Sequence, residues 1–288
     1  MNNERMLGDP GTVEVLRPKG RVLPVLFASP HSGRNYPSDF GTIQPMSVLR
    51  RAEDAFVDDL IRASVEHGVT IVNATFPRAY MDVNRDEDDL DPGLIQGVES
   101  PRPGEKSRLG IGLIRRVVTP EFPIYDRLLS MNEVKGRIEN YYRPYHRAIA
   151  DSLDRLRSLG RPVAFIDWHS MKSVGNAATP DGSGVQRPDV VMGDLFGTSC
   201  SGGLTEVVES YLRKVGLSVS VNKPYAGAAT LCRYGKPDHA IHAFQIEMNR
   251  AIYLNEETVE LKPEGFARLT AVIQGLVPVL GSWCNSNN

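Results

Sequence analysis

The chain has 288 residues, 41% of them hydrophobic, which is enough to bury a full core. Its net charge of −2 is spread without long blocks of one sign, which argues against a nucleic-acid-binding protein. No stretch approaches 18 consecutive apolar residues, so we expect no membrane span. Three widely spaced cysteines and no evident signal peptide favour a cytoplasmic protein without disulfide bonds.

The first chemical feature follows the first expected strand. Residues 1–20 carry several glycines and prolines and are expected to be an irregular lead-in, with residues 21–288 forming one domain. A buried strand is expected at 22–28, and it runs into Ser29-Pro-His31-Ser-Gly33. Gly33 lacks a side chain, so this turn would let the backbone come close to a bound ion or ligand. The alternative is that His31 is a loop histidine with a backbone partner.

An acidic run lies on the next expected element, a helix over residues 45–67. Residues four apart share a helix face, so Asp54 and Asp58 are expected to point the same way. Charges on a helix usually form a solvated face, but like charges at this spacing are unfavourable unless a cation lies between them. The run therefore offers Glu53 or Asp54 as a ligand for a cation.

Two arginines follow the second expected strand, at 69–75. Arg78 and Arg85 flank Asp82 and Asn84 within one short segment. Guanidinium groups bind carboxylates and can hold a polarised carbonyl oxygen, and Asp82 could orient one of them. The alternative is a surface ion-pair cluster.

The middle of the chain is expected to contain a long loop and a helix hairpin. Residues 86–108 are rich in proline, glycine and charge and are too long for an ordinary connection, so we expect an active-site loop. The hairpin is expected over 123–159, interrupted at Pro144. His146 on its second helix is expected to face the substrate or pack in the core.

The central strand is expected at Val163–Ile166, a short apolar run buried on both faces. It is followed by Asp167, Trp168, His169 and Ser170, and open α/β sheets place their ligands at such strand ends. His169 would bind a metal through one ring nitrogen, while Asp167 could hold the other N–H or the local backbone in place. The alternative is a polar strand end that caps the next loop.

The last chemical feature is Glu247, at the end of a strand expected at 243–246. A partly desolvated carboxylate there would have a raised pKa, suited to general-base work on a metal-bound water. The alternative is an ion pair with Arg250 or another arginine. The other elements expected in this half are a strand at 189–192, a helix at 201–215, a strand at 217–221, a polar loop at 222–238 that contains Arg233, and a terminal helix from 256 to about 280 broken near Pro263 and Pro278.

Strands and helices alternate throughout, which predicts a parallel or mixed sheet with helices on both faces. The polar residues described above then gather at strand ends. Two histidines, one carboxylate and a water form a catalytic zinc site with one open position. Such a site ionises its water near neutral pH and polarises a carbonyl, which together with an arginine and a glutamate suits amide hydrolysis.

With these motifs the chain resembles the N-formylglutamate amidohydrolase family over residues 20–275. The likeness rests on five motifs: Ser-Pro-His31-Ser-Gly, Glu53-Asp54-x3-Asp58, Arg78-x3-Asp82-x-Asn84-Arg85, Asp167-x-His169-Ser170, and Gln245-Ile-Glu247-x-Asn249-Arg250-x2-Tyr253. It implies a three-layer α/β/α, phosphorylase/hydrolase-like fold with a mostly parallel mixed sheet, similar to zinc carboxypeptidases and aspartoacylases. Those relatives carry a His-x-x-Glu pair, whereas Arg34 stands three residues after His31 here.

The resemblance also implies a role for each candidate residue. One Zn²⁺ per chain, or another divalent metal, would be held by His31, His169 and Asp54, with Glu53 as the alternate carboxylate. Arg78 would stabilise the oxyanion, and Glu247 would act as general base and then acid. The residues expected to bind the substrate are Asn84, Arg85, Arg233 and His146.

These roles predict hydrolysis of the formyl amide of an acidic amino acid such as N-formyl-L-glutamate. Another N-acyl amino acid or a short peptide remains an alternative substrate, since a basic pocket fits many carboxylates. A non-catalytic metal-binding or ligand-binding homologue is a further alternative, which Arg78 and Glu247 argue against because metal storage needs neither. The expected partner is a small anionic N-acyl amino acid, and a homodimer is compatible with the sequence.

Overall fold

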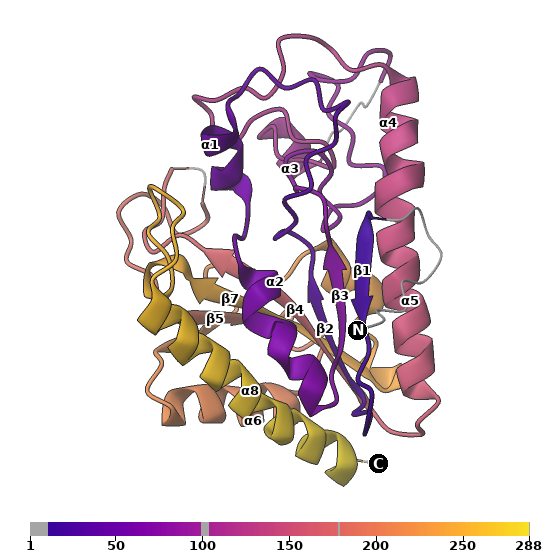
Figure 1. Cartoon of the computed structure of the whole chain (residues 1–288), viewed down its shortest axis with the longest axis vertical. Helices are drawn as coiled ribbons and strands as arrows, with labels where there is room; N and C mark the ends of the chain where they lie inside the picture. The colour runs from indigo at the N-terminus through magenta and orange to yellow at the C-terminus, as the bar shows by residue number, and fades with distance from the viewer. Residues whose placement is uncertain (1–10, 99–103, 178, 288) are drawn as a thin grey trace.

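The computed structural model describes residues 11–98, 104–177 and 179–287. Its centre is a seven-stranded sheet in the order β1-β3-β2-β4-β7-β5-β6 (Figure 1). β1 on β3 and β5 on β7 are antiparallel and the other neighbours are parallel, which confirms the mixed, mostly parallel sheet. The strands are β1 (Val13–Leu16), β2 (Val25–Ser29), β3 (Thr70–Ala74), β4 (Val163–Met171), β5 (Val190–Gly193), β6 (Val219–Val221) and β7 (Ile241–Asn249).

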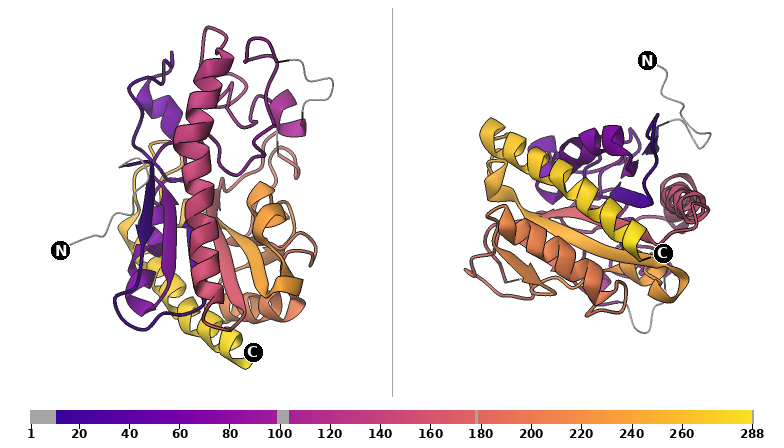
Figure 2. Two further views of the ribbon diagram at one scale, coloured as in Figure 1. Left: turned by 90° about the vertical axis from the view of Figure 1, so that its right-hand side faces the viewer. Right: turned by 90° about the horizontal axis from the view of Figure 1, so that it is seen from below.

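Helices cover both faces of this sheet, so the predicted α/β/α layering is confirmed (Figure 2). One core cluster joins the sheet to α2 (Val57–Arg62), α6 (Gly202–Lys214) and α8 (Pro263–Ser286), and the other joins it to α5 (Arg143–Arg157). Successive side chains of a strand point to opposite faces, so β4 contributes Ile166 and Trp168 to the first cluster and Phe165 to the second. The shorter helices are α1 (Met46–Leu49), α3 (Glu105–Arg108), α4 (Met131–Arg137) and α7 (Ala229–Tyr234).

The two central strands are longer than their apolar runs. β4 continues beyond Ile166 to Met171 and pairs along its length with β7, so His169 lies opposite Glu247. The backbone hydrogen bonds do not require apolar side chains, and Trp168 and Ile246 keep the other face apolar. The polar residues therefore stand within a rigid ladder rather than in a loop after it.

The helix predicted over residues 45–67 is wrong in its middle. α1 and the 3₁₀ turn Arg50–Ala52 end at Glu53, whose backbone is extended, and α2 begins only at Val57. The amide of Asp54 donates instead to the carbonyl of His31 at 3.0 Å. Asp54 and Asp58 therefore do not share a helix face, because a tertiary hydrogen bond replaces the helical one.

The lead-in predicted at residues 1–20 also needs correction. Residues 1–10 lie outside the described part of the chain, but residues 13–16 form β1, which pairs antiparallel with β3. The domain boundary placed at residue 20 therefore does not follow the sheet.

Three further elements differ from their predictions. In place of a hairpin, α4, the π turn Ile138–Tyr142 and α5 follow one another without a loop from Met131 to Arg157, and Pro144 lies in the first turn of α5. The polar loop at 222–238 contains α7. The terminal helix begins at Pro263 rather than at 256, because proline suits the first turn, where an amide has no partner to lose, and Pro278 lies inside the helix without ending it.

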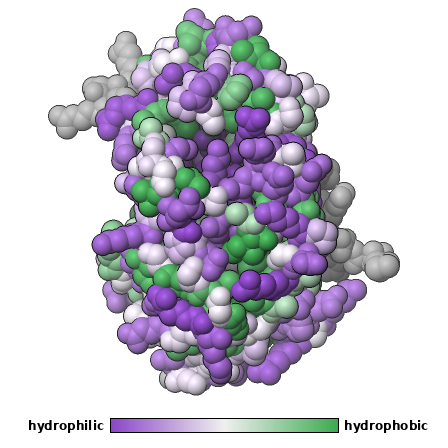
Figure 3. Space-filling model, turned by 90° about the vertical axis from the view of Figure 1, so that its left-hand side faces the viewer, coloured by the Kyte–Doolittle hydropathy of each residue, from purple (hydrophilic) through white to green (hydrophobic). Residues whose placement is uncertain are grey.

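Helix α8 is also the one helix of the described residues that is long and apolar enough to cross a membrane by length and composition alone. Its buried side chains, among them Leu269, Ile273 and Leu280, belong to the core cluster shared with α2 and α6. Core helices of globular proteins pass the same test. Figure 3 shows one face of the molecule, on which hydrophobic residues are interspersed with hydrophilic ones. The homodimer stays a prediction.

Gly33 is required for a reason other than the predicted approach to an ion. A Cβ atom at this position would lie 2.2 Å from the carbonyl oxygen of Phe76 and 2.4 Å from the carbonyl carbon of Thr75. The amide of Asn35 donates to the Thr75 carbonyl at 2.9 Å, so the segment after β2 is bound tightly to the segment after β3. The absent side chain makes room for backbone, and this contact fixes the position of His31.

We predict that Gly33→Ala lowers the free energy of unfolding by about 3 kcal/mol, because backbone on both sides of the new methyl group must move. Urea unfolding followed by circular dichroism measures this change. The matched control is Gly136→Ala in α4, where an added Cβ meets nothing within 4 Å and should be neutral or stabilising. Equal stability of the two variants would contradict the close approach.

Candidate metal centre

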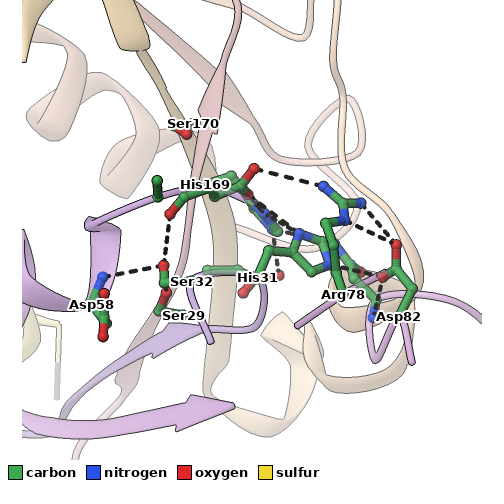
Figure 4. A network of polar contacts seen from close by, with 12 residues as sticks. Ser29, His31, Ser32, Asp58, Arg78, Asp82, His169 and Ser170 are labelled. Carbon is green, nitrogen blue, oxygen red and sulfur yellow. Dashed lines mark hydrogen bonds and ion pairs between the residues drawn. The ribbon is translucent and has the colours of Figure 1, made fainter. Parts of the chain in front are cut away.

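Three polar side chains from distant parts of the chain meet in the interior. His31 follows β2, Asp54 precedes α2, and His169 lies in β4, and all three are buried. His31 Nδ1 lies 3.1 Å from His169 Nδ1 and 3.3 Å from Asp54 Oδ2, and His169 Nδ1 lies 3.0 Å from the same carboxylate oxygen (Figure 4). The structure thus brings together the three residues predicted as metal ligands.

The outer nitrogen of each imidazole faces another carboxylate. His31 Nε2 lies 2.7 Å from Asp82 Oδ1, and His169 Nε2 lies 3.1 Å from Asp167 Oδ2. A carboxylate accepts a proton-bearing nitrogen, so both rings carry hydrogen on Nε2 and direct Nδ1 at Asp54. The predicted contact between Asp167 and His169 is confirmed, whereas the partner of His31 was not predicted.

The pKa values show what these contacts do to charge. Burial and the Arg78 guanidinium lower the pKa of His31. Burial alone would lower the pKa of His169 too, but the carboxylates of Asp167 and Asp54 outweigh burial and raise that pKa well above its usual value. Burial would raise the pKa of Asp54, yet the contacts with both histidines and the charge of Arg78 hold it well below its usual range.

The arrangement fits a divalent metal ion. Ligand bonds of about 2.0–2.1 Å in a tetrahedral zinc site place neighbouring ligand atoms about 3.3 Å apart. The three distances among His31 Nδ1, His169 Nδ1 and Asp54 Oδ2 are 3.0–3.3 Å. These residues are therefore a group that could hold a metal ion. Glu53, the alternate carboxylate, instead accepts hydrogen bonds from Tyr36 Oη at 2.6 Å and Arg50 Nε at 3.3 Å.

Two arginines neutralise the carboxylates of the centre. Arg78 donates from Nε and Nη2 to Asp82 Oδ2, at 3.2 and 2.8 Å, and its Nη1 lies 3.6 Å from Asp54 Oδ1. The prediction that Asp82 orients one of the two arginines is confirmed. Arg250 donates to Asp54 Oδ1 at 2.8 Å and to Ser170 Oγ at 3.0 Å. Arg250 thus pairs with Asp54, not with Glu247 as the alternative interpretation held.

Glu247 lies opposite His169 on the neighbouring strand, and its carboxylate makes no hydrogen bond to another described residue. Burial is the main cause that raises its pKa to about 7, and the charge of Asp54 adds to it, while His169, Arg78 and Arg250 act in the opposite direction. A carboxylate with this pKa can take up and release a proton near neutral pH.

The predicted substrate residues lie at varying distances from this centre. Asn84 Nδ2 lies 3.2 Å from His169 Nε2, and its Oδ1 accepts from the amide of Thr230 at 2.9 Å. Arg85 donates from Nε to the Ile111 carbonyl at 3.1 Å and from Nη1 to the Asn84 carbonyl at 2.7 Å. A cavity of about 420 Å³ borders both, but its wall includes Asp86, Asp88, Asp89 and Glu105, which disfavour an anion on that side.

Arg233 and His146 stand farther away and contact none of the three candidate ligands. Arg233 donates to Tyr142 Oη at 2.7 Å, and Tyr142 Oη donates to the Arg85 carbonyl at 2.8 Å. The His146 ring packs against the tyrosines and lies 2.9 Å from Tyr234 Oη through Nδ1. Burial and the charge of Arg233 lower the pKa of His146 to about 3, so it is neutral. Their roles in substrate binding stay predictions.

Sequence reasoning missed Arg250 as a partner of Asp54 and missed Arg115 altogether. Arg250 stands within the motif that carries Glu247, but it lies 196 positions from Asp54 along the chain, so their contact could not be inferred without the fold. Arg115 lies in an irregular segment with no periodic pattern and no neighbouring motif.

The fold and the centre together define an α/β protein with a buried histidine–aspartate–histidine group at the carboxyl end of its parallel strands. A sequence model described as N-formylglutamate amidohydrolase matches residues 23–254, and the chain belongs to this family. The crystal structure of N-formylglutamate amidohydrolase from Ralstonia eutropha JMP134 is 38% identical and superposes with a TM-score of 0.89, covering 96% of this chain and 100% of that one.

Two sequence relatives agree with this assignment. N-formylglutamate deformylase from Pseudomonas putida is 27% identical over 267 residues, 91% of this chain and 93% of the relative. The protein of the same name from Pseudomonas aeruginosa is 28% identical over 276 residues, 94% of this chain and 97% of the relative. The chain is therefore an amidohydrolase by family.

We predict that Glu247→Gln stabilises the metal-depleted protein at alkaline pH. The folded-state pKa of about 7 lies above the ordinary 4.5, so ionising Glu247 costs folding free energy as the pH rises through this window. The variant should be more stable by about 1–3 kcal/mol at pH 8.5 and no different at pH 4. Urea unfolding at both pH values measures the difference.

The control is Glu206→Gln on the exposed side of α6, which should show no such dependence on pH. A difference between wild type and Glu247→Gln that is the same at both pH values would contradict the desolvation of Glu247.

Proposed function

We propose that this protein hydrolyses the N-formyl amide of an acidic amino acid, with N-formyl-L-glutamate as the substrate, and that it uses one Zn²⁺ per chain. The observation that carries the proposal is the meeting of His31, Asp54 and His169 beside Glu247 and Arg78. The names of the two Pseudomonas relatives and of the Ralstonia structure support the formyl substrate. Like the substrate, the cytoplasmic location is proposed, and it rests on composition.

His31 Nδ1, His169 Nδ1 and Asp54 Oδ2 would hold the metal ion, which supplies a Lewis acid that lowers the pKa of water and polarises the acyl carbonyl. Asp82 and Asp167 keep hydrogen on the outer nitrogens, so both Nδ1 lone pairs stay free. These two carboxylates thereby fix the ring orientations.

Glu247 takes the proton of the attacking water and returns it to the nitrogen of the leaving amino acid. Its lack of a hydrogen-bonding partner among the described residues leaves the carboxylate available for both transfers. Arg78 carries the positive charge that faces the developing oxyanion, and Asp82 holds its guanidinium in place. Asn84 and Arg85 are proposed to hold a carboxylate of the substrate.

The decisive experiment is metal analysis combined with measurement of formate release from N-formyl-L-glutamate. We expect about one zinc per chain, formate release that a chelator abolishes, and its recovery when zinc is restored. Glu247→Gln should keep its zinc but lose at least about 100-fold in kcat. Zinc bound without formate release would contradict the proposed substrate, and a failure to bind any divalent metal would contradict the proposed centre.

We predict that Asp82→Asn weakens zinc binding by about 10–100-fold, because an uncharged partner makes His31 Nδ1 a poorer ligand. Competition with a chelating dye measures the dissociation constant. The control is Asp151→Asn, which removes a carboxylate from the exposed surface of α5 and should leave zinc affinity unchanged. Unchanged affinity in Asp82→Asn would show that the hydrogen bond to His31 does not tune the centre.

A further inference from the structure

Arg115 is a buried arginine close to the candidate centre. Its side chain is nine-tenths buried, and its Nε atom has no hydrogen-bonding partner among the described residues. Within the described part of the chain it forms no ion pair. An unpaired charge in a protein interior lowers the free energy of unfolding, so a buried cation is usually paired with an anion from the protein or from a ligand.

The backbone around Arg115 is bound to the segment that carries Asp82 and Arg85. The amide of Asp82 donates to the Leu113 carbonyl at 2.8 Å, and Arg85 Nε donates to the Ile111 carbonyl at 3.1 Å. Ile111 and Arg115 face each other in an antiparallel bridge. Leu113 and Ile114 are buried, so this turn is anchored on both sides of the contact with the site.

The charges that act on Arg115 are those of the candidate centre. Burial and the nearby guanidinium of Arg78 together lower its pKa to about 9, against the opposing effect of Asp82. Arg85 and Asp54 also act on it. Even so the side chain stays a cation at neutral pH.

The neighbouring arginines already have hydrogen-bonding partners within the protein. Arg78 is bound to Asp82, and Arg250 is bound to Asp54. Arg85 donates from Nε and Nη1 to backbone carbonyls, and its Nη2 lies 3.9 Å from Asp82. Arg115 differs from them, because its buried Nε has no hydrogen-bonding partner among the described residues.

We propose that Arg115 binds the side-chain carboxylate of the substrate and so selects dicarboxylic N-acyl amino acids over neutral ones. This inference rests on the proposed function. The α-carboxylate is only two bonds from the scissile nitrogen and must stay near the centre, where Asn84 contacts His169 directly. The second carboxylate reaches farther, and the fork of a buried arginine binds it through charge-assisted hydrogen bonds.

The test compares N-formyl-L-glutamate with N-formyl-L-glutamine, which has the same shape without the side-chain charge. Arg115→Gln should lower kcat/KM for the glutamate compound about 100-fold, because a charge-assisted contact is lost. The same variant should change kcat/KM for the glutamine compound by less than about 3-fold. Arg147→Gln, which removes an exposed arginine of α5, should leave both values unchanged.

A second measurement needs no catalysis. In metal-depleted protein, calorimetric titration should show glutarate binding more tightly than butyrate, and Arg115→Gln should abolish that preference. This arm decides the role of Arg115 even if wild-type protein hydrolyses neither formyl compound, an outcome that would overturn the proposed function alone.

Two results would overturn the assignment of Arg115. One is an Arg115→Gln protein that still prefers the glutamate compound and glutarate. The other is an equal loss on both formyl compounds with a lower melting temperature, which is what a purely structural arginine would show. Under the proposal, Arg115→Gln removes an unpaired buried charge. In the absence of ligand, the variant should therefore be at least as stable as the wild type.

Discussion

The interior of this protein is organised around a cluster of polar and charged side chains that is shielded from water. His31, Asp54 and His169 meet with no more than 3% of any residue exposed. Such a group is stable only when every donor and acceptor has a partner, and here each member has one on its outer side. Asp82 and Asp167 receive the outer imidazole nitrogens, and the two arginines Arg78 and Arg250 share the Asp54 carboxylate.

The sheet makes that network possible by separating two kinds of surface. On β4 and β7, the side chains of Trp168 and Ile246 complete the apolar cluster beneath α2, α6 and α8. The alternate positions, His169 and Glu247, face the opposite side and stand next to each other in register. A slip of one residue between these strands would exchange the two faces and bury the polar groups in the apolar cluster. The apolar face therefore holds the catalytic face in position.

Much of this could be predicted from the sequence, and the failures share a cause. The apolar runs at 163–166 and 243–246 locate the central strands, and the polar residues that follow mark the site, because both signals are local. The break in the helix at Glu53 and Asp54 could not be predicted, since a hydrogen bond from Asp54 to His31 outweighs a local helical pattern. β1 was missed because its four residues are only half-buried and have meaning only beside β3. Arg115 carries no local signal, and only the fold shows that it lacks a partner.

The distances along the chain between the three meeting residues have a consequence for the order of events during biogenesis. His31 and Asp54 are 23 positions apart, but His169 lies 115 positions beyond Asp54 and on a different strand. A nascent chain that has emerged only as far as α5 can pair β1, β2 and β3, but it lacks β4, which carries the third group. The candidate metal centre is therefore complete only after β4 has joined β2, late in the synthesis of the sheet.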